Sequence, residues 1–232
     1  KMLNKKITVV ICNIKKKSKR LRNKNFIKIY NVPLYQITLN KLLKCKFDKV
    51  YVDTDSEEIK RYCKKKKINI INRIPFLATD RANGNHLINY HRKIIKADYY
   101  FQIMVTSPLL KIKTINKCIK FLKKTKKFDS ILTSKTQQTY FWFKNKPINH
   151  DPKKLPRSQD LLPVIYETTA LYGIKKNALN KYKCRVGKKP YFHEVDDLEK
   201  TDLDTKKDLE YLEYLIKNER NLKKKRKEYL NF

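Results

Sequence analysis

The feature that most constrains the fold is an apolar run that leads directly into a dense group of cations. Residues 8–14 read Thr-Val-Val-Ile-Cys-Asn-Ile, and Lys15, Lys16 and Lys17 follow at once. A β-branched apolar run of this length is typical of a buried strand. In an open α/β sheet the ligand binds just beyond the carboxyl ends of the strands. A cationic loop at that place suits a polyphosphate, although three lysines are also ordinary in so lysine-rich a chain.

Strand-like and helix-like segments alternate along the rest of the chain. We expect strands over residues 49–55, 68–71, 99–105, 129–133, 170–174 and 191–195, and helices over 34–43, from 57 onward, 86–97, 111–124 and 205–229. Ser56 is expected to cap the second of these helices, residues 72–85 to form a loop, and Leu222 to lie on the apolar face of the last helix. This alternation predicts an α/β fold, a Rossmann-like mixed sheet with helices on both faces. Neither a glycine-rich dinucleotide fingerprint nor a Walker A motif follows the first strand, which argues against a dinucleotide-binding enzyme.

The residue composition of the sequence changes between residues 135 and 165. Pro147, Pro152 and Pro156 interrupt this stretch, and four aromatic residues stand together at 140–143. We expect a single domain over residues 1–232, with this segment forming an arm laid on the core or on another subunit. Exposed aromatic residues in such an arm mark an interface more often than a cofactor site.

A net charge of +35 would ordinarily indicate a nucleic-acid partner or an anionic membrane surface. Here the positive residues are mostly lysine, and they lie along the whole length of the chain instead of forming one stripe. A compositional bias that places lysine on solvated faces explains this pattern at least as well. Nucleic acid is therefore disfavoured as a partner, although the charge alone does not choose between anionic ligands.

Membrane and export signals are not recognisable in the sequence. The apolar runs are too short to cross a bilayer, and residues 8–14 are too short for the core of a signal peptide. The five cysteines are scattered and form no Cys-x-x-Cys pair, which is typical of reduced thiols. These features predict a cytoplasmic protein with no membrane association.

Polar residues that could carry chemistry stand where the expected strands end. Asp202 and Asp204 are two apart, so in an extended segment their carboxylates face the same side. Two carboxylates opposite a lysine-rich loop suit Mg2+ bridged to a nucleoside triphosphate. Asp204 could equally cap the last helix, which is expected to begin at Thr205. Gln102, on an apolar strand, could read the edge of a base or be satisfied by neighbouring backbone.

The order and spacing of these groups resemble the acylneuraminate cytidylyltransferase family, the CMP-sialic acid synthetases and their relatives. The family's opening loop, close to A-R-x-x-S-K-x-x-x-x-K-N, resembles residues 14–25. Its S-T-D-x-x-x-I, R-P-x-x-L-A-x-D and L-Q-x-T-S-P-L segments resemble residues 53–59, 73–80 and 101–109. Its Q-x-L-P and I-D-I-D-x-x-x-D segments resemble residues 159–163 and 201–208. Six motifs in this order cover nearly the whole chain.

This resemblance implies transfer of CMP from CTP to the anomeric hydroxyl of an acidic sugar, nonulosonic or related, with release of pyrophosphate. It assigns the nucleotide to Asn13, Ile14, Lys15, Ser18, Lys24, Asn25, Arg73, Asp80 and Gln102. Catalysis is assigned to Lys15, Lys24, Asp202 and Asp204, of which the two aspartates would bind Mg2+. Gln102, Arg157 and Tyr172 would contact the sugar. The resemblance also implies a homodimer that pairs through the arm.

Three departures from the family pattern bear on activity. Lys15 stands where the family has arginine, which keeps the charge but loses the planar fork. Lys16 and Lys17 replace a small or polar pair, and a positive φ at either would cost on the order of 1 kcal/mol. Thr168 and Thr169 replace the usual asparagine and glycine before the sugar-facing strand. These departures leave open a different acid sugar and a catalytically weakened relative. The net charge of +35 leaves a basic nucleic-acid-binding protein as a further alternative.

Overall fold

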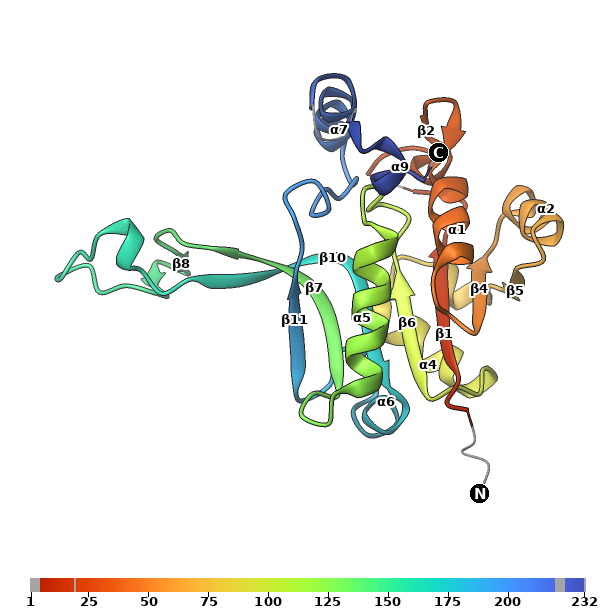
Figure 1. The fold of residues 1–232 in the computed structure, drawn as a ribbon, viewed down its shortest axis with the longest axis horizontal. Helices are drawn as coiled ribbons and strands as arrows, with labels where there is room; N and C mark the ends of the chain where they lie inside the picture. Colours follow the sequence, from red (N-terminus) through yellow and green to blue (C-terminus); the bar gives the residue numbers. More distant parts are fainter. Residues whose placement is uncertain (1–4, 19, 220–223, 232) are drawn as a thin grey trace.

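A seven-stranded mixed sheet forms the centre of the molecule (Figure 1). The computed structural model describes residues 5–18, 20–219 and 224–231. The strand order is β11 (Pro190–Glu194), β7 (Ser130–Gln137), β10 (Val164–Lys175), β6 (Tyr99–Ile103), β1 (Thr8–Ile14), β4 (Lys49–Thr54) and β5 (Asn69–Asn72). β10 runs antiparallel to both of its neighbours, whereas the other neighbouring pairs are parallel. The predicted α/β class with a mixed sheet is confirmed.

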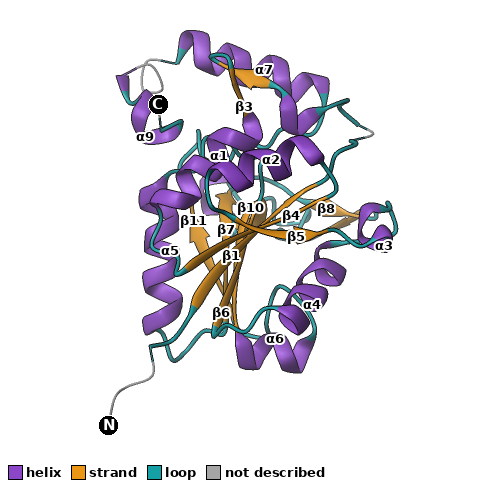
Figure 2. Ribbon diagram, turned by 90° about the vertical axis from the view of Figure 1, so that its right-hand side faces the viewer, coloured by secondary structure: helices purple, strands orange, loops and turns teal. Residues whose placement is uncertain are grey.

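Helices cover both faces of this sheet (Figure 2). α1 (Leu34–Lys44), α2 (Glu57–Lys65) and α5 (Ile112–Lys124) pack on one face, and α4 (Gly84–Ile94) and α6 (Lys176–Tyr182) pack on the other. The first strand is mostly apolar because alternate side chains enter two different cores. Val10 and Cys12 lie in the core beneath α1 and α5, and Val9 and Ile11 lie in the core beneath α4 and α6.

Short elements follow β1 and β5 at the carboxyl edge of the sheet. A 3-10 turn, η1 (Lys24–Phe26), leads into a small hairpin of β2 (Lys28–Ile29) and β3 (Val32–Pro33). Tyr30 and Asn31 at its tip both have positive φ, as a tight two-residue hairpin turn requires. Pro33 precedes α1 as its N-cap residue, and a single-turn helix, α3 (Pro75–Ala78), lies in the segment expected to be a loop.

The arm is a long two-stranded ribbon that projects from the body (Figure 1). β10 begins at Val164, well before the expected start at residue 170, because it continues to pair with β7 beyond the sheet, Val164 opposite Gln137. Beyond the ribbon lie β8 (Trp142–Phe143), β9 (Lys146–Pro147) and the 3-10 turn η2 (Ser158–Asp160). Pairing between distant segments, and not local propensity, therefore sets the length of this strand.

The prediction of one closing helix over residues 205–229 is wrong. α7 ends at Asn218, having begun at Lys206, and a separate short helix, α9, spans Arg226–Tyr229. Glu219 already has extended backbone angles, and Leu222, which was expected on the apolar face, lies outside the described residues. Tyr229 and Leu230 are buried in the main core. Burial of these two side chains requires the chain to turn back toward the sheet, which a continuous helix would prevent.

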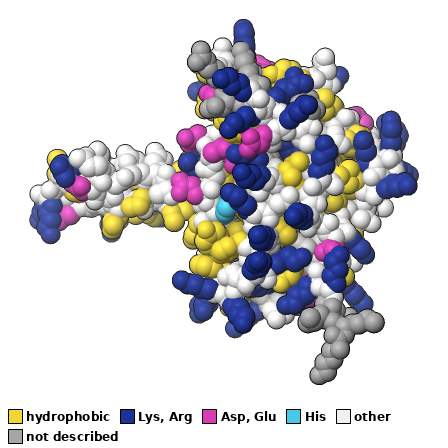
Figure 3. Space-filling view, viewed as in Figure 1, with side chains coloured by type: hydrophobic (Ala, Val, Ile, Leu, Met, Phe, Trp, Pro, Cys, Tyr) yellow, Lys and Arg dark blue, Asp and Glu magenta, His cyan; other side chains and the backbone are white. Residues whose placement is uncertain are grey.

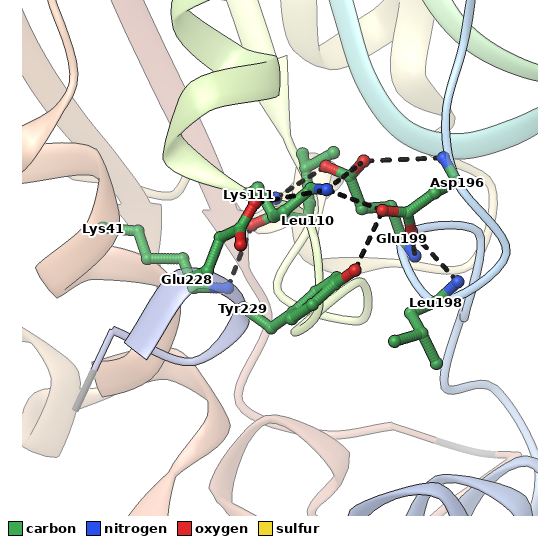
Figure 4. A network of polar contacts seen from close by, with 8 residues as sticks. All are labelled: Lys41, Leu110, Lys111, Asp196, Leu198, Glu199, Glu228 and Tyr229. Carbon is green, nitrogen blue, oxygen red and sulfur yellow. Dashed lines mark hydrogen bonds and ion pairs between the residues drawn. The ribbon is translucent and has the colours of Figure 1, made fainter. Parts of the chain in front are cut away.

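A network of polar contacts joins this C-terminal segment to the loop that follows β6 (Figure 4). Lys111 Nζ lies 2.6 Å from Asp196 Oδ2, and the Tyr229 hydroxyl donates to the same oxygen at 3.0 Å. Lys41, on α1, is only 3% exposed and donates to the backbone carbonyls of Pro108 and Leu110. Burial lowers the pKa of Lys41 to about 7. These contacts hold the segment after β6 in place beside the candidate site described below.

Hydropathy of the helices bears on the membrane prediction. Among the residues that the structure describes, no helix combines the length and the apolar character that a bilayer span requires.

Candidate active site

The loop after β1 is held against the carboxyl edge of the sheet by two hydrogen bonds. Asn25 Nδ2 donates to the Lys15 carbonyl oxygen at 2.8 Å, and the Lys16 backbone N–H donates to Asp55 Oδ1 at 2.6 Å. Asn23 takes the left-handed conformation that lets the loop enter η1, with φ of 53°. Lys16 and Lys17 do not have positive φ. The backbone strain that these two lysines would suffer in the left-handed region therefore does not arise.

A cationic cavity of about 280 Å³ opens inside this loop, facing the end of β6. Six of the predicted nucleotide-binding residues line it: Asn13, Lys15, Ser18, Lys24, Asn25 and Asp80. Lys17, Arg20 and the segment 104–106 complete the lining, and Lys15 Nζ donates to Asp80 Oδ1 at 2.9 Å. A second hollow of about 540 Å³ shares four of these lining residues. Together the two hollows form a cleft of net positive charge at the place where α/β sheets bind ligands.

The carboxylates predicted to bind metal lie beside this loop. Asp204 Oδ1 accepts a hydrogen bond from Lys24 Nζ at 2.6 Å, although the two residues are 180 positions apart, and its Oδ2 lies 2.8 Å from Arg20. The Leu203 backbone N–H donates to the Thr106 carbonyl at 2.8 Å, which fixes the segment at the end of β6. Loop, strand end and carboxylate pair thus meet at one place.

The alternative role of Asp204 as a helix cap is excluded by the start of α7. The N-cap residue is Thr205, whose hydroxyl accepts from the Asp208 backbone N–H while the Asp208 carboxylate accepts from Thr205. Because the capping box uses these two residues, the side chain of Asp204 is directed to Lys24 and Arg20 instead.

Asp202 is the more buried member of the carboxylate pair. Its Oδ2 accepts a hydrogen bond from Thr169 Oγ1 at 3.0 Å, and its Oδ1 is buried without a hydrogen-bond partner. Burial raises the pKa of Asp202, and the charge of Asp204 adds to the effect. Buried carboxylate oxygens are normally satisfied, so the unpartnered Oδ1 points to a missing donor or cation.

The pair of aspartates fits Mg2+ as a ligand set. Mg2+ in nucleotide sites is held by one or two carboxylates and takes its other ligands from phosphate oxygens and water. In the part of the chain that the structure describes, no group of three or more His, Cys, Asp or Glu side chains could hold a metal without such help. Asp202 and Asp204 would therefore hold the ion together with a bound triphosphate.

Two buried amide side chains have no hydrogen-bond partner for either polar atom, and one of them, Asn13, lines the cavity. Gln102, on β6, is 1% exposed, and Asn13, at the end of β1, has both side-chain polar atoms buried. Leaving a buried polar group unsatisfied costs about 1–3 kcal/mol, so a ligand that bonds to these amides gains affinity. Gln102 lies opposite Tyr172 on β10, whose hydroxyl donates to Glu167 at 2.6 Å and whose ring stacks under the Arg185 guanidinium at 3.7 Å.

The side chains of three predicted site residues make their contacts elsewhere in the structure. Arg73 is buried in an ion pair with Asp53, at 2.6 Å from Nε to Oδ1. Arg157 lies on the arm and pairs with Asp160 at 2.7 Å. The Ile14 side chain is part of the main core. The structure therefore does not bring these side chains together with the lysines of the loop, and their binding roles stay predictions.

Sequence reasoning did not assign three of the residues that the structure places here. Lys17 and Arg20 belong to the same cationic loop, so its charge was a usable signal for them. Thr169 carried no such signal, because its contact with Asp202 depends on an unusual backbone angle described below.

Fold and cavity define an α/β protein with a cationic cleft at the carboxyl edge of its sheet. A family model described as Cytidylyltransferase matches residues 9–230, nearly the whole chain. The chain belongs to the cytidylyltransferase family. This match includes the cationic loop and the carboxylate pair.

Known relatives are similar over most of this chain. N-acylneuraminate cytidylyltransferase A of Danio rerio is 25% identical over 185 residues, 75% of this chain and 43% of that protein. The Helicobacter pylori pseudaminic acid cytidylyltransferase and UDP-2,4-diacetamido-2,4,6-trideoxy-beta-L-altropyranose hydrolase is 25% identical over 205 residues, 84% of this chain and 40% of that protein. The chain thus spans less than half the length of these relatives.

A solved structure shares the fold. The structure of CMP:2-keto-3-deoxy-manno-octonic acid synthetase complexed with CTP aligns with a TM-score of 0.69 at 15% identity. The alignment covers 92% of this chain and 99% of that one. This agreement shows that the two chains share the fold over most of their length.

Proposed function

We propose that the chain is a Mg2+-dependent cytidylyltransferase that transfers CMP from CTP to the anomeric hydroxyl of an acidic sugar, nonulosonic or related, and releases pyrophosphate. The observation that carries the proposal is the contact of Lys24, which lines the cavity, with Asp204, one member of the carboxylate pair. Family membership and relatives named for acylneuraminate and pseudaminic acid support the choice of nucleotide and sugar.

The cations of the loop would bind and neutralise the triphosphate. Lys15, Lys17, Arg20 and Lys24 line the cavity, and the charge of a departing pyrophosphate develops where they converge. The sugar hydroxyl oxygen would attack the α-phosphorus and give up its proton to solvent, and the bond from the α-phosphorus to the bridging oxygen would break with its electron pair leaving on pyrophosphate. Mg2+ held by the two aspartates would supply further charge neutralisation on the phosphate oxygens. Fixed cations in a cavity need little reorganisation as this charge develops.

The buried amides of Asn13 and Gln102 would form hydrogen bonds with uncharged groups of the substrates. Gln102 is placed by β6 beside Tyr172, so its amide would bond to the base or the sugar at the centre of the sheet edge. Arg157, which is exposed on the arm, would contact the sugar carboxylate in the site of a second subunit. An arginine fork suits a carboxylate because it donates two parallel hydrogen bonds.

A direct test measures pyrophosphate release with each of the four nucleoside triphosphates, Mg2+ and a panel of nonulosonic acids. We expect release with CTP and one acid, and its loss on chelation of the metal. CTP binding without turnover on any acid would indicate the catalytically weakened relative. Salt-sensitive binding of DNA or RNA without CTP binding would overturn the proposal in favour of the nucleic-acid alternative. Against that alternative, Lys and Arg are spread over the face shown in Figure 3.

The apolar surface of the arm supports a homodimer. Trp142, Phe143 and Leu162 are exposed by 56%, 64% and 73%, and hydrophobic side chains are visible along the arm in Figure 3. A projecting ribbon with such side chains buries them by pairing with a second copy.

Replacing Trp142 and Phe143 together with glutamate is expected to convert a dimer into a monomer, because two charges would then enter the apolar interface. Sedimentation equilibrium measures the change in mass. Tyr214→Glu is the matched control, since Tyr214 is 61% exposed on α7, away from the arm. A wild-type chain that sediments as a monomer, or a double variant that stays dimeric, would contradict pairing through the arm.

A further inference from the structure

Thr169 has a backbone conformation that a β-branched residue rarely adopts. Its φ is 58°, in the left-handed region where the side chain crowds the following carbonyl. The residue lies within a bulge of β10, because the register with β7 shifts between Glu167 and Tyr172. Bulges beside functional sites re-aim a side chain, and backbone strain of this kind persists only where the surroundings hold it.

The bulge aims the Thr169 hydroxyl at the more buried of the two candidate metal ligands. Thr169 Oγ1 donates to Asp202 Oδ2 at 3.0 Å. Asp202 Oδ1 is buried and has no hydrogen-bond partner, although Thr106 lies close to the same carboxyl group. One carboxylate oxygen is therefore held by the protein, and the other is left available.

The neighbouring threonine shows that burial of a hydroxyl here is not enough to form the hydrogen bond with Asp202. Thr168 is 5% exposed, and its Oγ1 has no hydrogen-bond partner. A glycine at position 169 would adopt the same backbone without steric strain, but it would lose the hydroxyl. The contact with Asp202 is thus specific to the side chain at 169 and is made at the expense of backbone strain.

We propose that Thr169 is a positioning residue of the cation site, whose hydroxyl fixes the Asp202 carboxylate so that Oδ1 faces a divalent cation bound with the nucleotide. The inference rests on the proposed function, because it takes Asp202 as a ligand of that cation. Outer hydrogen bonds of this kind orient ligands, and their loss typically lowers metal affinity about 10-fold to 100-fold.

The experiment measures the Kd for Mg2+ by calorimetry on the full chain in the presence of CTP without sugar, together with the melting temperature. We expect Thr169→Val and Thr169→Gly to raise this Kd about 10-fold to 100-fold. Thr169→Ser, which keeps the hydroxyl, is expected to retain most of the affinity. Thr168→Val is the matched control, because it removes an adjacent buried hydroxyl that has no partner.

The glycine variant separates positioning from folding. Thr169→Gly removes the steric strain, so its melting temperature is expected to rise while its Mg2+ affinity falls. A merely structural role would move the two quantities in the same direction. Unchanged Mg2+ affinity in the valine and glycine variants would overturn the role of Thr169. Mg2+ binding that depends on Thr169 in a chain that releases no pyrophosphate from CTP would support that role and overturn the proposed function instead.

Discussion

Replacing Asp204 with alanine is expected to lower the rate of CTP-dependent pyrophosphate release by about 100-fold to 1000-fold, the loss typical of removing one electrostatic contact to a transition state. The carboxylate lies 2.6 Å from Lys24 and 2.8 Å from Arg20, so it holds the loop. In the proposed function it is also a ligand of the metal. Alanine leaves these two cations without their acidic partner and removes half of the carboxylate pair. Initial rates at saturating CTP and Mg2+ measure the loss.

Glu213→Ala is the matched control for this prediction, because it removes the same charge from an exposed position on α7, just beyond the site. Its rate is expected to equal that of the wild type. The melting temperatures of both variants show whether lost activity reflects lost structure. Equal rates in the two variants would show that Asp204 takes no part in catalysis and would leave only Asp202 as a ligand.

Replacing Asp53 with alanine is expected to lower the free energy of unfolding by about 3–5 kcal/mol, because it breaks a buried ion pair on one side only. Asp53 is fully buried at the end of β4, with Oδ1 at 2.6 Å from Arg73 Nε and Oδ2 at 2.6 Å from His91 Nε2. The Arg73 side chain is itself only 3% exposed. Alanine would therefore leave a guanidinium in the interior without its carboxylate. Urea unfolding at neutral pH measures the change.

The same contacts predict the pH dependence of this effect. Burial opposes ionisation of Asp53, but the hydrogen bond with His91 and the charge of Arg73 hold its pKa below the usual 3.8. Since the unfolded chain then binds the proton more readily, this stabilisation is present above pH 3.8 and is lost as the pH falls through the folded-state pKa. The difference in stability between wild type and Asp53→Ala is thus expected to shrink in acid.

A surface pair gives the control for the Asp53 prediction. Glu57 is exposed and pairs with Lys60 one turn further along α2, so Glu57→Ala is expected to leave the free energy of unfolding almost unchanged. If Asp53→Ala costs no more than Glu57→Ala, the buried cluster contributes no net stabilisation, and the contacts of Arg73 do not hold the end of β4.

Local sequence signals were enough to place most elements of this protein. The β-branched run of β1 and the alternating elements after it predicted the α/β sheet because periodicity and propensity act over a few residues. Ser56 was correctly expected to cap α2, where its side chain accepts from the Ile59 backbone N–H. The α6 helix was not predicted, because its short sequence shows only a weak helical spacing of apolar residues.

Boundaries and contacts that depend on distant segments were beyond such signals. The full length of β10 follows from its pairing with β7, and the break between α7 and α9 follows from the burial of Tyr229. The sequence predicts that Arg73 contacts the ligand, but only the fold shows that its guanidinium pairs with Asp53. Sequence spacing carries no information about which of several nearby acids an arginine will meet.

The loop after β1 shows which features the sequence determines and which depend on the tertiary structure. By itself the sequence determined that a strand ends in a cluster of cations, because both features are local. Only the tertiary structure decided that Lys24 meets Asp204, 180 positions away, and that Thr169 holds Asp202. The physical reason is that these contacts depend on the order of strands in the sheet and on one strained backbone angle, and both are set by the packing of the whole chain.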